Sequence, residues 1–287
     1  MNQNKQSTLW LLAALAAPIA HFSGSGWLTA SLTAAAILPL FLLPRSWEDL
    51  PKPLAYLEVL WLGTVAGLLL PASAVNWPSD NAYVVPLTIL SLAILTNAAA
   101  APRIGAVLVF CMAILAIPVT ISAAAHIEPA WLLPTATPWS PYLALTLLLS
   151  TLPMAGERRR DITYTALLTI ALTVLNQGVL SPQVAANLPD PFYQTARTLG
   201  HLEPIAAAGL TLGWYALTTF LLQSAAEIAR NAGIGRMWAS VLVSATPTFL
   251  VLFPQQPNGN FVLIISVFLW LIAPFVRKIN VFEKSEK

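Results

Sequence analysis

Long apolar runs separated by short polar segments cover nearly the whole chain. A helix needs about 20 mostly apolar residues to cross the hydrocarbon core of a bilayer. Glycine, proline or charged residues bound most of the runs that approach this length, and each is interpreted as a membrane span. The predicted spans cover residues 8–22, 26–43, 54–72, 82–101, 104–125, 139–156, 162–181, 202–227, 236–254 and 260–276. The pattern therefore predicts an all-α integral membrane protein with about ten transmembrane helices.

Composition strengthens this prediction, because 57% of the 287 residues are hydrophobic and only 9% are charged. Such a chain is not an ordinary soluble protein. Connections between the runs are short, except at residues 44–53, 126–138 and 182–201. No segment resembles a soluble domain, so residues 1–287 are predicted to form a single polytopic membrane domain.

The distribution of basic residues predicts the orientation of the spans. With the N-terminus inside, thirteen of the fourteen Lys and Arg residues lie on the inner side, and only Arg197 lies outside. Cytoplasmic loops carry the excess of Lys and Arg in membrane proteins. We therefore expect a multi-pass protein of the cell membrane, with membrane lipid as its surroundings and both termini cytoplasmic. The basic charge reflects this topology and does not indicate nucleic-acid binding.

The N-terminal run has a second interpretation. Lys5, the apolar run 9–17 and the small residues after it also resemble a signal peptide. Cleavage would leave nine spans in the same orientation. We favour retention, because the outer segment that would follow, residues 21–26, is too short to form a mature N-terminus.

The long connection 126–138 divides the chain into halves of five spans each, at about 1–125 and 139–276. An odd number of spans makes the two halves run in opposite directions, which is the geometry of inverted-repeat transporters. The other two long connections occupy equivalent positions in the halves. Spans 3 and 8, also equivalent, each contain a GxxxG pair, Gly63/Gly67 and Gly209/Gly213, for which packing within the chain is favoured over dimerisation.

Residues 182–201 are predicted to be ordered on the outer surface. Asp190 is a suitable N-cap and Pro191 a suitable first helical residue. Phe192, Ala196 and Leu199 share one helical face, whereas other positions are polar. The segment is either a capped surface helix or a movable cap over a binding site.

No common catalytic or metal-binding signature occurs. The chain contains no P-loop, HExxH, CxxC or GxSxG motif, so we expect neither enzyme activity nor a cofactor. His21, His126 and His201 lie near the predicted outer boundary and are expected to be interfacial polar residues, not metal ligands. The single cysteine, Cys111, is expected to be inert packing.

Ionisable residues lie near the ends of the predicted spans. Glu58 lies one turn into span 3, Glu203 begins span 8, and Glu227 is spaced to pair with Arg230. A proton relay through the centre is therefore poorly supported. Amide side chains lie deeper and are expected either to join helices or to contact a ligand. These amides are Asn97, Asn176, Gln177 and Gln223.

Spans 1 and 6 are both short, and both contain proline near small polar residues. Pro18 precedes the run Ser23-Gly24-Ser25-Gly26, and Ser150-Thr151 precedes Pro153. Interrupted helices at matching positions of two halves indicate a binding site in transporters. Unpaired backbone groups at such interruptions would suit a small zwitterion.

In span order, nearly the whole chain resembles the B-subunit family of spore germination receptors, within the amino acid/polyamine/organocation transporter superfamily. The resemblance rests on a short span 6 ending Leu152-Pro153, the run Glu157-Arg158-Arg159-Arg160, and the outer segment PFYQTARTLGHLEP ending in Leu202-Glu203 and Pro204. Gly26-Trp27-Leu28 and the start of span 5 also match. Runs 6–27 and 134–153 are shorter than in the family pattern, so the chain resembles a shortened or divergent member.

The resemblance implies a ten-span subunit of the spore inner membrane. Such a subunit would sense a small germinant, often an amino acid, beside other germination receptor subunits. It also implies a binding site between spans 1 and 6. The candidate substrate-binding residues are Pro18, His21, Ser23, Thr146, Ser150 and Glu203.

Two alternatives stay open. The inverted halves favour a secondary transporter of amino acids or related small organic ions. The short spans 1 and 6 favour a membrane scaffold subunit that binds no ligand. The sequence does not identify the ligand, the coupling ion or the oligomeric state.

Overall fold

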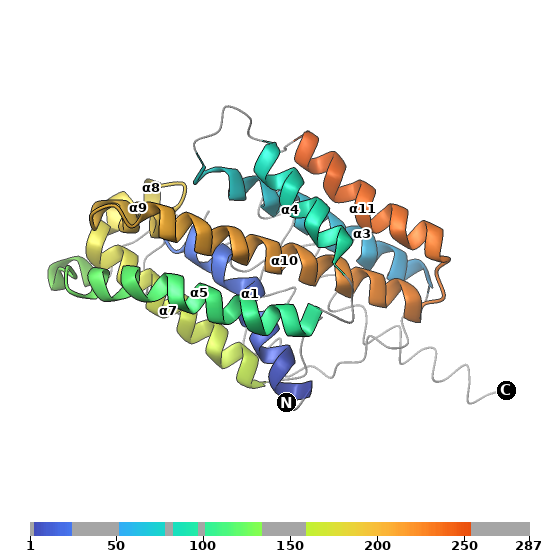
Figure 1. The fold of residues 1–287 in the computed structure, drawn as a ribbon, viewed down its shortest axis with the longest axis horizontal. Coiled ribbons are helices and arrows are strands. Elements are labelled where there is room, and N and C mark those ends of the chain that lie inside the picture. Colours follow the sequence, from blue (N-terminus) through green and yellow to red (C-terminus); the bar gives the residue numbers. More distant parts are fainter. Residues whose placement is uncertain (1–2, 25–51, 78–82, 97–100, 134–158, 254–287) are drawn as a thin grey trace.

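The computed structural model describes residues 3–24, 52–77, 83–96, 101–133 and 159–253. Every regular element in these ranges is helical (Figure 1). The long helices are α1 (Gln3–Phe22), α3 (Lys52–Leu69), α4 (Val84–Leu95), α5 (Ala101–Ala124), α7 (Arg159–Leu180), α10 (Glu203–Asn231) and α11 (Arg236–Leu252). The short ones are η2 (Leu70–Ala74), η3 (Pro129–Leu132), α8 (Pro182–Asn187) and α9 (Pro191–Thr198).

Each long helix corresponds to one predicted span, namely spans 1, 3, 4, 5, 7, 8 and 9. Predicted spans 2, 6 and 10 lie outside the described residues. The third span differs from its prediction, because its α-helix ends at Leu69 and continues as the tighter 3-10 helix η2. Pro71 explains the change, since proline has no N–H and its ring conflicts with the carbonyl four residues earlier in an α-helix.

Among the described residues, three stretches are long and apolar enough to cross a membrane: Lys52–Ala74, Arg103–Ala124 and Glu203–Asn231. Shorter apolar stretches occur in α1, α4, α7 and α11. The α5 stretch is far more exposed than the other two. Val107, Phe110 and Ile121 each expose more than half of their surface, which suits a helix that faces hydrocarbon.

Helix α10 is the centre of the fold. It packs against α1, α5 and α9, and also against α3, α4 and α11. In Figure 1 it runs through the middle of the molecule, with α1 and α5 on one side and α3, α4 and α11 on the other. Trp214, Leu217 and Leu221 on α10 are almost completely buried in the main hydrophobic cluster. The longest helix therefore joins the other helices into one core.

Side-chain contacts establish the relative directions of the helices. Trp10 contacts Phe220, with ring centroids 6.3 Å apart, and His21 contacts Trp214. Because residue numbers rise along α1 and fall along α10, these two helices are antiparallel. Helices α3 and α11 are parallel, since Gly63 faces Thr246 and Gly67 faces Leu250. Odd-numbered and even-numbered spans of a chain cross a membrane in opposite directions. Spans 1 and 8 are therefore expected to be antiparallel and spans 3 and 9 parallel, as α1 with α10 and α3 with α11 are.

The predicted glycine pairs mark close approaches within the chain. A Cβ atom on Gly67 would lie 2.8 Å from the Cα of Pro247, and one on Gly213 would lie 2.5 Å from the Cβ of Ala17. The intrachain packing predicted for these positions is therefore confirmed. Gly209 is less crowded, with Leu115 at 3.6 Å from its ideal Cβ position.

The sequence leaves open whether span 1 is interrupted at Pro18, and the structure shows no interruption there. Helix α1 continues from Gln3 to Phe22 with Pro18 inside it. Pro18 removes only one helical hydrogen bond, the one to the carbonyl of Ala14. Ala14, Ala17 and Ile19 are fully buried, and α1 packs against α5, α7 and α10. This packing holds the helix together across the missing bond.

Candidate functional site

Helix α9 begins at the N-cap predicted for it. The Oδ1 atom of Asp190 accepts a hydrogen bond of 3.0 Å from the backbone N–H of Tyr193, and Pro191 is the first helical residue. Phe192 and Ala196 on the predicted apolar face are buried and Arg197 is exposed, but Thr195, outside that face, is buried as well. Capping orients the carboxylate of Asp190 at the start of α9.

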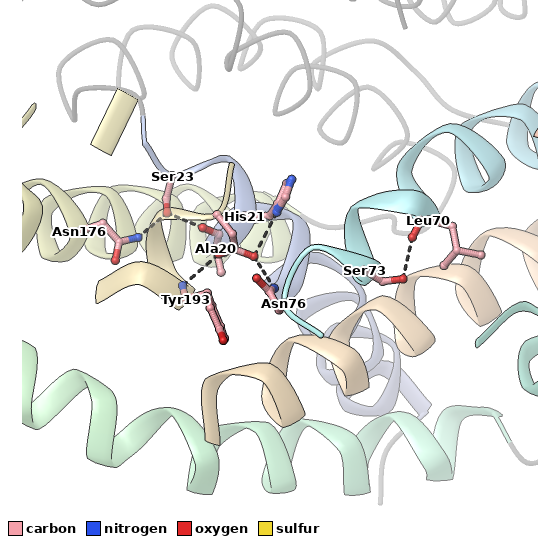
Figure 2. A network of polar contacts seen from close by, with 9 residues as sticks. Ala20, His21, Ser23, Leu70, Ser73, Asn76, Asn176 and Tyr193 are labelled. Atoms are coloured by element: carbon pink, nitrogen blue, oxygen red, sulfur yellow. Dashed lines mark hydrogen bonds and ion pairs between the residues drawn. The ribbon is translucent and has the colours of Figure 1, made fainter. Parts of the chain in front are cut away.

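The second oxygen of this carboxylate joins α9 to two distant parts of the chain. Asp190 Oδ2 lies 3.1 Å from Nδ1 of His21 on α1 and accepts a 2.7 Å bond from Nδ2 of Asn76, which follows η2 (Figure 2). An ionised carboxylate only accepts hydrogen bonds, so the imidazole proton lies on Nδ1. Three hydrogen bonds therefore satisfy a side chain with no exposed surface.

A second set of hydrogen bonds joins the same end of α1 to α7 and α9. Asn176 on α7 donates to Oγ of Ser23 at 2.5 Å, and it accepts from the hydroxyl of Thr195 on α9 at 2.8 Å. Ser23 in turn donates to the carbonyl of Ala20 at 2.6 Å. We call these six buried side chains, His21, Ser23, Asn76, Asn176, Asp190 and Thr195, the α1–α9 polar cluster.

Close backbone packing accompanies the polar cluster. Gly24, in the turn after α1, faces the carbonyl oxygen of Ala185 on α8, and its ideal Cβ position lies 2.8 Å from Cγ of Pro191. No larger side chain fits there without movement of α8 or α9. The α8–α9 segment (residues 182–198) therefore rests directly on the C-terminal end of α1.

The polar cluster makes the position of α9 depend on every one of its members. A hydrogen bond contributes about 1 kcal/mol net, or about 1.5–3 kcal/mol when one partner is charged, whereas a buried polar group left unpaired costs about 1–3 kcal/mol. A displacement of α9 would break several of these bonds together. The cluster thus holds α9 docked on α1.

The candidate residues from the sequence are distributed unevenly around this cluster. His21 and Ser23 belong to it, and Pro18 lies one turn earlier on α1. Glu203 begins α10 and lies 4.0 Å from the fully exposed His201, so it does not join the cluster. Thr146 and Ser150 lie outside the described residues.

Some members of the cluster were not recognised as site residues from the sequence. Asp190 was recognised only as a helix cap, and Asn76 and Thr195 were not singled out. Asn176 was expected either to join helices or to contact a ligand, and here it joins α7 to α1. Its neighbour Gln177 donates a hydrogen bond of 2.6 Å to the carbonyl of Trp131, and this bond joins α7 to η3.

The three histidines differ from one another in their surroundings. His126 and His201 are exposed, as interfacial residues are expected to be, but the expectation is wrong for His21, which is 8% exposed. Its hydrogen bond with Asp190 and its contact with Trp214 explain this burial. Within the described ranges, no three His, Cys, Asp or Glu side chains converge as metal ligands.

Glu58 is a buried carboxyl group in the N-terminal half of α3. Only 2% of its surface is exposed, and its Oε1 atom has no hydrogen-bond partner among the described residues. The predicted pair Glu227–Arg230 is confirmed at 3.7 Å, but both members are exposed and contribute little to stability. Glu58 therefore differs from Glu227, because its carboxyl group is buried and one of its oxygens is unpaired among the described residues.

No family model matches this sequence, and no curated protein is significantly similar to it.

Proposed function

We propose that this chain is a multi-pass membrane subunit that senses a small polar molecule, such as an amino acid, as the resemblance to germination receptor B subunits implies. On this proposal the chain has ten spans in two inverted halves and both termini in the cytoplasm. It acts beside other receptor subunits, in the inner membrane of a spore. The proposal gives the α8–α9 segment the role of a movable cap.

The α1–α9 polar cluster is the observation that supports a sensing role. It joins α9 to α1, α7 and the residue after η2 through buried hydrogen bonds. A ligand changes a conformational equilibrium only by the difference between its affinities for the two states. A small polar molecule that exchanges hydrogen bonds with this cluster would favour one position of α9 over the other. The contact of α1 with α10 would transmit this change to the core.

The direct test is ligand-induced stabilisation of the purified protein. We expect one or more members of a panel of protein amino acids and common nucleosides to raise the melting temperature, because a ligand that binds only the folded state stabilises it. His21→Phe should abolish the rise, since Phe retains a ring beside Trp214 but loses the bond to Asp190. His126→Phe is the matched control, because His126 is exposed and its ring contacts the carbonyl of Ser122 one turn earlier, not a member of the cluster. A panel without any effect on the wild-type protein would contradict the sensing role.

Secondary transport is the alternative that the predicted inverted halves favour. Antiparallel α1 and α10, and parallel α3 and α11, agree with an alternating order of spans. Uptake of a stabilising ligand into proteoliposomes under an ion gradient would identify a transporter. Stabilisation without uptake above empty vesicles would favour a sensor.

The continuity of α1 through Pro18 favours the second alternative, a scaffold subunit without a ligand. Such a scaffold would show neither stabilisation nor uptake. It would instead require its partner subunits for stability, which co-expression with the neighbouring genes would test by comparing yields of the folded chain.

A further inference from the structure

Three buried polar side-chain atoms near the C-terminal end of α1 have no hydrogen-bond partner within the described part of the chain. They are Oδ1 of Asn76, Oγ1 of Thr173 and Nε1 of Trp214. The three residues are 4%, 1% and 1% exposed. Buried polar groups are paired in the great majority of cases, so each exception requires an explanation.

These atoms belong to residues that surround the same end of α1. Asn76 and His21 share one oxygen of Asp190. The ring of Trp214 contacts the ring of His21 edge to face, with centroids 5.7 Å apart. Thr173 lies one helical turn before Asn176 on the same face of α7, and Asn176 contacts Ser23. The turn after η2, α7 and α10 each contribute one of the unpaired atoms.

The unpaired state is unusual for each residue type in this protein. Threonines at other helical positions, such as Thr218 and Thr219, donate to the carbonyl four residues earlier, but Thr173 does not. The indole N–H of Trp77 donates to Thr211, whereas that of Trp214 has no acceptor. The amide of Asn76 must direct its NH2 group at the carboxylate of Asp190, because the carboxylate only accepts. The side-chain carbonyl oxygen of Asn76 is thereby left without a hydrogen-bond partner in the described part of the chain.

The chemistry of the three atoms limits what they would recognise. Trp214 offers a donor, Asn76 an acceptor, and Thr173 a hydroxyl that does either. The carboxylate of Asp190, which contacts both His21 and Asn76, already accepts three hydrogen bonds. A charged group would therefore meet no unmatched charge among these residues. A primary amide or a lactam presents both an N–H donor and a carbonyl acceptor without net charge.

We infer that Asn76, Thr173 and Trp214 form a subsite for a neutral amide or lactam group of the sensed molecule. This inference rests on the proposed function and names the chemical class of its ligand. The ligand carbonyl accepts from the indole of Trp214, and the ligand N–H donates to the carbonyl of Asn76. Binding satisfies atoms that are otherwise buried and unpaired, which favours the arrangement in which α9 is docked on α1.

The experiment compares three probes of similar length in thermal unfolding of the purified full chain: L-glutamine, L-glutamate and L-methionine. Only glutamine has the amide group, so we expect it alone to raise the melting temperature. The expected rise is about 2–4 °C when the probe is present at about five times its Kd. Uridine, whose base has a lactam edge, provides a second probe of the same chemistry.

Two substitutions test the residues themselves. Trp214→Phe removes the indole N–H but retains an aromatic ring, and Thr173→Val removes the hydroxyl without changing the shape. Thr173→Val should fold at least as well as the wild-type protein, because it loses an unpaired buried group. Trp214→Phe leaves a cavity in the core and should unfold at a lower temperature, so the rise caused by glutamine is measured against the ligand-free protein of each variant. Both variants should lose most of this rise. Trp10→Phe and Thr219→Val are the matched controls. Trp10 lies about three turns from His21, and the hydroxyl of Thr219 is already paired.

The outcomes separate this inference from the proposed function. Equal rises with glutamine and methionine, or a glutamine response that is retained in both test variants, would overturn amide recognition and leave ligand sensing intact. A melting temperature that rises with other amino acids, but not with glutamine or uridine, would also overturn amide recognition and leave ligand sensing intact. No rise with any member of the full panel would contradict the sensing role, and the subsite with it.

Discussion

The imidazole of His21 and the carboxylate of Asp190 lie 169 positions apart in the sequence, yet a 3.1 Å hydrogen bond joins them in the buried interior. One residue ends the first helix and the other begins α9. This bond lies at the centre of the α1–α9 polar cluster. It is also the contact that most directly couples the α8–α9 segment to the helical core.

Replacement of Asp190 should destabilise the protein even when the helix cap is retained. In Asp190→Asn the Oδ1 atom still accepts from Tyr193, but an NH2 group replaces the oxygen that now faces two donors. Loss of these bonds should lower the free energy of unfolding by about 1–3 kcal/mol, measured as a lower melting temperature in detergent. Glu227→Gln makes the same chemical change at an exposed site and should have almost no effect. Equal melting temperatures for Asp190→Asn and wild type would contradict the assigned contacts.

His21 and Asp190 should be energetically coupled. In a double-mutant cycle with His21→Phe and Asp190→Asn, the loss in the double variant should be smaller than the sum of the two single losses, by about 0.5–3 kcal/mol. The reason is that either single change already breaks the shared bond. Additive losses would mean that the two side chains do not interact. Reversible unfolding in mixed micelles would measure the cycle.

The two glycines of α10 should respond in opposite ways to a methyl group. Gly213→Ala would place its Cβ against Ala17, and overpacking typically costs about 1–3 kcal/mol. Gly209→Ala meets only Leu115 at an ordinary contact distance, and alanine is the better helix former by about 1 kcal/mol. Thermal unfolding of the two variants should therefore show destabilisation of the first and none of the second. The reverse order would contradict the packing of α1 on α10.

Removal of the carboxyl group of Glu58 should preserve or increase stability. Glu58→Met retains the length of the side chain and removes a buried oxygen that has no partner among the described residues. Such a group costs about 1–3 kcal/mol when it is unpaired. A marked fall in melting temperature would instead identify a stabilising contact of Glu58. Leu62→Met, a similar substitution of a buried residue one turn further along α3, controls for the effect of the methionine side chain itself.

The two ends of α10 should lie on opposite sides of the membrane. After Cys111→Ala has removed the native thiol, single cysteines at the exposed positions Arg197 and Asn231 report the two sides. A membrane-impermeant maleimide applied to intact cells should label Arg197→Cys and should label Asn231→Cys only after lysis. Labelling of both cysteines in intact cells would contradict the orientation predicted from the basic residues.

The sequence determined those properties that depend on neighbouring residues. The apolar runs predicted each of the long helices in the described ranges, because helix length and hydrophobicity are local properties. The cap at Asp190 and the pair Glu227–Arg230 were predicted for the same reason, since their partners lie within three positions. The sequence left open whether the first helix is interrupted at Pro18. The tertiary structure decided this point, because packing against neighbouring helices compensates for one missing hydrogen bond.

The tertiary structure alone decided which polar residues meet. His21, Asn76 and Asp190 lie on separate elements, and nothing in their local sequence indicates that one carboxylate joins them. The same is true of Ser23, Asn176 and Thr195. Hydrophobic periodicity shows which face of a helix is buried but not which helix covers it, so contacts over such distances arise only when the helices have packed together.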